Sequence, residues 1–111
     1  MTTLLILYLA SGVLLMLLSL PLLWGKVPPN GLYGFRVRAT LENPSIWYAA
    51  NKYAAKRMLS SGAVLVAAAV ALYFIPGISV DVYSLACLFL FAVPFVMGLI
   101  QSLRYVKSLA R

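Results

Sequence analysis

The residues that could do chemistry gather in one polar segment, residues 28–52, of a chain that is otherwise strongly apolar. This segment holds Arg36 and Arg38 two positions apart, and alternate side chains of an extended chain point the same way. Two guanidinium groups side by side suit a carboxylate or a phosphate group. The alternative is that both arginines lie on anionic lipid headgroups and only mark the orientation of the chain in a membrane.

Catalytic groups are scarce in this sequence. It has no His, the commonest general base, and its two carboxylates, Glu42 and Asp81, fall on opposite sides of the membrane in the topology predicted below. No metal-ligand cluster, phosphate-binding motif or nucleophile–base pair can be assembled from the remaining residues. We therefore expect no enzymatic activity, no metal and no cofactor.

The elements that position the polar segment are predicted to cross a membrane. The chain is 64% hydrophobic and 10% charged, whereas soluble domains are nearer half apolar and about a quarter charged. Three uncharged runs, residues 4–24, 58–75 and 82–103, approach the ~20 residues that span a bilayer core. We expect a single domain over residues 1–111: an all-α membrane protein with three transmembrane helices and an interfacial amphipathic helix within residues 25–57.

The basic residues predict how the chain is oriented. All nine Lys and Arg residues lie either between the first and second apolar runs or after the third. Because basic loops stay in the cytoplasm, we expect a cell-membrane protein with its N-terminus outside and its C-terminus inside. The net charge of +7 then favours anionic lipid over nucleic acid as a partner. The basic residues are Lys26, Arg36, Arg38, Lys52, Lys56, Arg57, Arg104, Lys107 and Arg111.

The segment between the first two runs divides into a loop and a helix. Residues 26–40 have no helical period, Pro29 disfavours helix, and Asn30 followed by Gly31 is a turn signal. Gly34 predicts a positive φ or a close backbone approach. The pair Asn43-Pro44 predicts a helix start, with Asn43 as the N-cap.

The predicted interfacial helix has one apolar face and one basic flank. We expect it to run from Pro44 and to bend near residues 60–62 before the second transmembrane helix. Asn51 is the unusual member of the apolar face, because a buried amide needs hydrogen-bond partners. These partners are either the backbone of residues 28–43 or a bound ligand. The apolar face consists of Trp47, Ala50, Asn51, Ala54 and Met58, and the basic flank carries Lys52 and Lys56.

Small residues line the second transmembrane helix. Ala63, Ala67 and Ala71 repeat at intervals of four, with Gly62 beside them, and such lines permit close helix packing in lipid. They pack either against the other two helices or against a second copy of the chain; we favour the former. Asp81 is expected to cap the third helix.

The pattern Pro29-Asn30, Gly34-Phe35-Arg36, Asn43, Trp47 and Asn51, after one transmembrane helix and before two more, resembles the SdpI family of small bacterial and archaeal membrane proteins. The best-known members of that family protect a toxin-producing cell from its own secreted membrane-active peptide, and some hold a transcriptional repressor at the membrane. Those members carry extra helices before a domain like this one. The resemblance maps onto Asn30, Gly34, Arg36, Asn43, Trp47 and Asn51, and the chemistry of the segment adds Arg38, Glu42, Lys52 and Arg57.

The resemblance implies an immunity protein with a polar site on the inner face, where Arg36 binds an anionic group and Trp47 and Asn51 shape the site. Its partners would be anionic lipid headgroups, a peptide toxin or regulatory protein, or a second copy of the chain. The alternatives are a lipid-phosphate-binding protein or small transporter that uses the same loop, and a structural subunit of a membrane complex.

Overall fold

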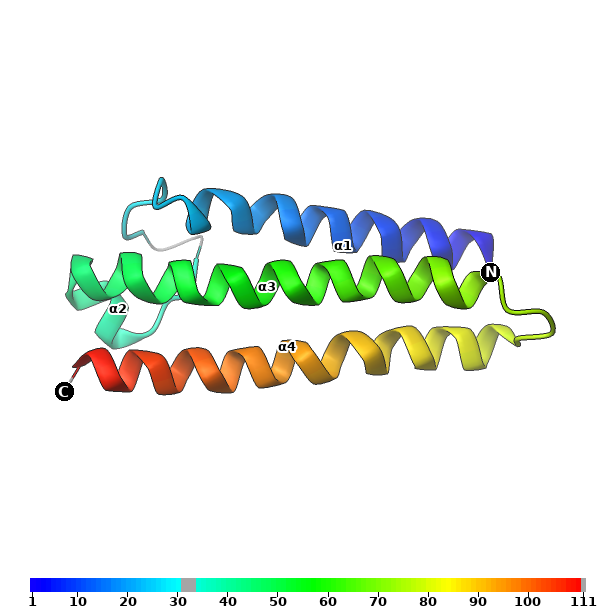
Figure 1. Ribbon diagram of the computed structural model, residues 1–111. Helices are drawn as coiled ribbons and strands as arrows, with labels where there is room; N and C mark the ends of the chain where they lie inside the picture. The colour runs from blue at the N-terminus through cyan, green and yellow to red at the C-terminus, as the bar shows by residue number, and fades with distance from the viewer. Residues whose placement is uncertain (31–33, 111) are drawn as a thin grey trace.

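The computed structural model describes residues 1–30 and 34–110. Within these residues the chain is helical, and the helix in the middle of the bundle, α3, packs against both α1 and α4 (Figure 1). Three of the helices are long and apolar enough to cross a membrane, as predicted, and the all-α class is confirmed for the described residues. The helices are α1 (Thr2–Leu23), α2 (Arg38–Glu42), α3 (Pro44–Tyr73) and α4 (Val80–Ala110).

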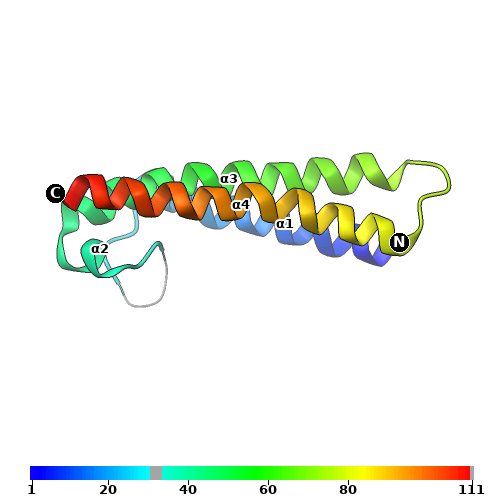
Figure 2. The ribbon, with the colours of Figure 1, turned by 90° about the horizontal axis from the view of Figure 1, so that it is seen from below.

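The two ends of the bundle carry different parts of the chain. The N-terminus and the turn between α3 and α4 lie together at one end, which we call the N-terminal end. The short helix α2 lies at the other end, beside the start of α3 and the last turns of α4 (Figure 2). We call this second end the loop end.

The helix α3 is longer than predicted. It runs without interruption for 30 residues, so the separate interfacial helix is not confirmed and the expected bend near residues 60–62 is absent. The hydroxyls of Ser60 and Ser61 donate to carbonyls one turn earlier, both at 3.0 Å. The polar groups that suggested a break are therefore satisfied within the helix itself.

The start of α4 also differs from the prediction. The helix begins at Val80, and the hydroxyl of Ser79 accepts a hydrogen bond from the Val82 N–H at 3.2 Å. Ser79 is therefore the capping residue, and the expectation that Asp81 caps this helix is wrong. Asp81 lies in the first turn, where a carboxylate still interacts favourably with the helix dipole.

Two glycines, Gly12 and Gly62, lie where α1 and α3 approach each other closely. A Cβ atom at Gly12 would lie 3.0 Å from the carbonyl oxygen of Gly62, and one at Gly62 would lie 2.9 Å from the carbonyl oxygen of Gly12. Both residues are buried. Any side chain at either position would push the two backbones apart, so this crossing depends on glycine.

The alanine line on α3 does not take part in this packing. Ala63, Ala67 and Ala71 are all exposed on the outer face of the helix. The favoured expectation, that they pack against the other helices of the same chain, is therefore wrong. The reason is geometric: the side of α3 that faces α1 and α4 carries Gly62, Leu65 and Ala69 instead.

Aromatic residues fill the N-terminal end of the bundle. Tyr83 is fully buried and donates its hydroxyl to the Ala69 carbonyl at 2.8 Å, which joins α4 to α3. The Tyr8 and Ser84 hydroxyls lie 2.7 Å apart and join α1 to α4. In an apolar solvent such bonds between helices cannot be exchanged for bonds to water, so they help to fix the helices at this end.

We expect Gly62→Leu to destabilise the bundle, because the new side chain would collide with the backbone of α1. Overpacking of this kind typically lowers the free energy of unfolding by about 1–3 kcal/mol. The measurement is thermal unfolding in detergent. Ala63→Leu adds the same side chain at the neighbouring exposed position and should unfold close to the wild-type temperature. An unchanged unfolding temperature for Gly62→Leu would contradict the close crossing.

Candidate functional site

One buried amide side chain on α3 holds the polar segment against the bundle. The Oδ1 atom of Asn51 accepts the backbone N–H of Phe35, while its Nδ2 atom lies 3.4 Å from the Phe35 carbonyl oxygen and 2.9 Å from the Trp47 carbonyl oxygen. Asn51 is 2% exposed. Both ends of the amide are thus used on backbone groups, as in the structural alternative considered for this residue.

The neighbouring tryptophan makes a second tie to the same segment. The indole Nε1–H of Trp47 donates to the carbonyl of Val27 at 2.7 Å, and no part of the side chain is exposed. Trp47 and Asn51 lie one turn apart on α3, so they hold the segment at two points. We call these two side chains, with their bonds to Val27 and Phe35, the loop anchor.

Gly34 fits the loop anchor for two reasons. Its φ is +117°, in a region that L side chains rarely adopt. A Cβ atom at Gly34 would also lie 2.9 Å from Oδ1 of Asn51 and 3.1 Å from two ring atoms of Trp47. The prediction of a positive φ or a close approach is confirmed, because this position has both.

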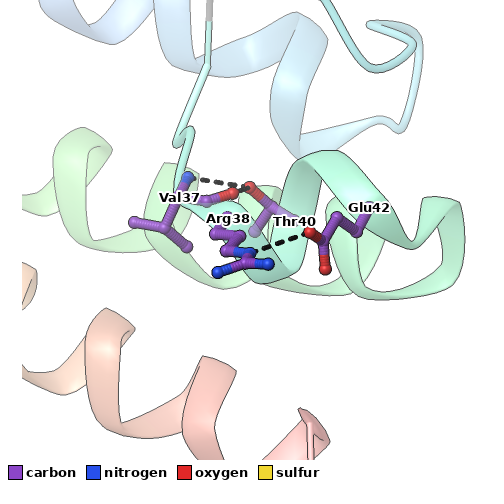
Figure 3. A network of polar contacts seen from close by, with 4 residues as sticks. All are labelled: Val37, Arg38, Thr40 and Glu42. Atoms are coloured by element: carbon purple, nitrogen blue, oxygen red, sulfur yellow. Dashed lines mark hydrogen bonds and ion pairs between the residues drawn. The ribbon is translucent and has the colours of Figure 1, made fainter.

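The helix α2 was not predicted, and one threonine organises it (Figure 3). The hydroxyl oxygen of Thr40 accepts the Val37 N–H at 2.9 Å and lies within donating distance of the carbonyl oxygens of Val37, 2.8 Å, and Phe35, 3.2 Å. Thr40 is fully buried. Residues 38–40 are therefore helical rather than irregular or extended.

The two arginines of the segment consequently have different surroundings. Arg38 lies in α2, where its Nε atom is 2.9 Å from Oε1 of Glu42, one helical turn later (Figure 3). Both side chains are largely exposed, so the pair contributes little to stability. Arg36 is exposed and directly follows the anchored Phe35.

The remaining predicted residues lie around this core. Asn43 accepts the Ser45 N–H at 3.0 Å and so caps α3 as predicted. The Asn30 amide donates to the Pro28 carbonyl at 2.8 Å. Gly31, the second residue of the predicted turn, lies outside the described residues. Lys52 is exposed, and Pro29 is half-buried.

Sequence reasoning missed two residues that organise the polar segment, Thr40 and Val27, and it did not single out Phe35 among the backbone partners open to Asn51. A backbone carbonyl carries no residue-specific signal, so Val27 could not have been found. Thr40 could have been noticed as a small polar residue between the basic loop and the Asn43 cap. Within residues 1–30 and 34–110, no group of His, Cys, Asp or Glu could hold a metal ion.

The fold and the site define a class: a small multi-pass membrane protein of three long apolar helices, whose polar segment after the first helix is tied back to the second. The sequence model of the SdpI/YfhL protein family matches residues 26–103, from just after α1 to the last turns of α4. The chain belongs to this family. No curated protein and no solved structure matches it.

We expect Gly34→Ala to cost more stability than Gly25→Ala. Gly25 also has a positive φ, +69°, but a Cβ atom there would meet nothing within 4 Å. A left-handed alanine costs about 1–2 kcal/mol, which is the full expectation for Gly25→Ala. Gly34→Ala adds the collisions with Asn51 and Trp47. Thermal unfolding in detergent measures both, and equal losses would contradict the close packing of Gly34.

Proposed function

We propose that this protein is a non-enzymatic SdpI-type protein of the cell membrane that protects the cell from a membrane-active peptide through the exposed side of its anchored loop. The family match supports the protein class. The observation that carries the proposed site is the double hold of Asn51 on the Phe35 backbone. Because Arg36 is the next residue, its backbone has a fixed place relative to the bundle.

The proposed orientation puts this loop in the cytoplasm. Every Lys and Arg among the described residues lies at the loop end, while the N-terminal end carries none. The positive-inside rule then supports a cytoplasmic loop end and C-terminus, with the N-terminus outside. A fluorescent protein that matures only in the cytoplasm, fused to the C-terminus, should be bright. A dark fusion at normal expression would contradict this orientation.

In this proposal the exposed cations bind an anionic group, and the buried residues hold them in place. Arg36 is the principal contact, and Lys52, exposed one position after Asn51, is the second. Arg38 contributes less, because Glu42 offsets its charge. A cation on a segment with fixed backbone loses less freedom when it binds, which favours binding over the same charge on a free loop.

The proposed protection can be tested with Arg36→Gln in cells challenged by a synthetic amphipathic Lys/Leu peptide that permeabilises bilayers. We expect wild-type protein to raise survival, and Arg36→Gln to remove most of that gain at equal membrane levels. Lys56→Gln makes the same charge change at an exposed position on α3 outside the loop, and it should keep the protection.

Two outcomes would contradict this proposal. Wild-type protein that gives no protection would overturn the protective role. Full protection by Arg36→Gln would overturn the role of the loop. Thermal unfolding of each variant in detergent separates these outcomes from a loss of folding.

A further inference from the structure

An apolar cavity lies among the three long helices at the loop end. It has a volume of about 320 Å³, within the range of small-molecule sites. α1 lines one side, α4 the other, and α3 lies between them. Its apolar lining includes Leu15, Leu18 and Leu22 of α1, Met58 of α3, and Phe95 and Leu99 of α4.

The cavity exists because small residues border it, whereas aromatic side chains fill the bundle at the N-terminal end. Ala54, Ser61, Gly98 and Ser102 border it, at positions where larger side chains would fill the space. The Ser61 and Ser102 hydroxyls donate to carbonyls four residues earlier in their own helices, at 3.0 Å and 2.7 Å. These polar groups are therefore satisfied, and the surface that remains for a ligand is apolar.

The segment that the loop anchor holds forms one wall of this cavity. Gly34 and Phe35 line it, and Asn51 holds the backbone of Phe35 from behind through both its N–H and its carbonyl. This wall of the cavity is therefore held in a fixed position by hydrogen bonds. Among the residues of the family motif, Gly34 and Phe35 line the cavity, and Asn51 acts on it by positioning Phe35.

Among the residues that the structure describes, one charged residue borders the cavity. Arg57 lines it, and a Cβ atom at Gly98 would lie 2.9 Å from the Arg57 Cβ. Gly98 precedes Arg104, the first basic residue of α4, by six positions, roughly 9 Å along a helix. The Arg57 side chain is exposed, and its guanidinium lies over the Tyr53 ring at 5.2 Å.

Within the described part of the chain, this arginine has no anionic partner. The chain has only two side-chain carboxylates: Glu42 pairs with Arg38, and Asp81 lies at the far end of α4. The Tyr53 hydroxyl, 3.4 Å from Nη2, is neutral. A second cavity of about 160 Å³ also borders Arg57 and is lined by Gln101, whose amide N–H can hydrogen-bond an oxyanion.

We propose that the cavity binds one acyl chain of an anionic phospholipid, with the lipid phosphate paired to Arg57. The apolar lining suits a hydrocarbon chain, and the unpaired guanidinium suits a phosphate group, which it contacts bidentately. Anionic lipids are abundant where the loop end would meet the membrane. This inference does not depend on the protective role proposed above.

The test compares two lipids and one ion on the full chain in mild detergent. The ligands are phosphatidylglycerol, diacylglycerol with the same acyl chains but no phosphate, and inorganic phosphate, and binding is measured by native mass spectrometry and by the shift in unfolding temperature. We expect wild-type protein to retain phosphatidylglycerol and to bind the other two at least about tenfold more weakly, since a hydrogen bond to a charged group contributes on this scale.

Two variants test the two halves of the site. Arg57→Gln should weaken phosphatidylglycerol binding about tenfold and leave the binding of diacylglycerol, which has no phosphate, unchanged. Lys56→Gln is the matched control, with the same charge change one residue away, and should bind as wild type. Ser102→Leu fills the cavity, and because the Ser102 hydroxyl bonds only within α4, it should weaken both lipids without unfolding the bundle.

Three results would overturn the proposal. The first is equal binding of the two lipids by wild-type protein, and the second is an equal loss for Arg57→Gln and Lys56→Gln. The third is unchanged phosphatidylglycerol binding by Ser102→Leu. If Arg57→Gln does not fold, Ser102→Leu and the wild-type lipid comparison decide the question alone.

Discussion

A primary amide that bonds to the N–H and the C=O of one distant residue imitates the pairing of a neighbouring strand. Asn51 does this to Phe35, sixteen residues earlier in the chain, from a position where water cannot compete. A buried amide without hydrogen-bond partners would cost about 1–3 kcal/mol of stability. Release of the Phe35 segment would therefore lose the hydrogen bonds and also leave the Asn51 amide unsatisfied. Gly34 must lack a side chain for this approach.

The helix α3 carries three of the contacts that fix the fold. At the loop end, α3 carries Trp47 and Asn51 of the loop anchor. In its middle, Gly62 packs against α1. Near its other end, the Ala69 carbonyl accepts a hydrogen bond from the Tyr83 hydroxyl of α4. Since α3 is one continuous helix, these contacts are placed relative to one another by a rigid element. The aromatic packing at the N-terminal end and the cavity at the loop end are therefore parts of one arrangement.

The sequence predicted the features that local chemistry determines. The three apolar runs, the Asn43 cap and the special conformation of Gly34 were all evident, because hydropathy, capping and positive φ depend on few neighbouring residues. The structural alternative for Asn51 was also within reach, since a buried amide must find partners.

Features that depend on tertiary contacts were out of reach. The continuity of α3 through Ser60, Ser61 and Gly62 depends on side-chain bonds along the helix and on contact with α1. The alanine line around Ala67 has the spacing of an interface, yet its direction follows from where α1 and α4 lie. The cavity bordered by Arg57 is lined by residues of α1, α3 and α4, so no single segment of the sequence predicts it.

Hydrogen exchange of the Phe35 backbone amide is the most direct test of the central claim, that Asn51 holds the loop against α3. In folded wild-type protein this amide should exchange as slowly as amides of α3 near Asn51, although it lies outside any helix. In Asn51→Leu it should exchange rapidly while the α3 amides stay protected. Rapid exchange of the Phe35 amide in folded wild-type protein would contradict the account.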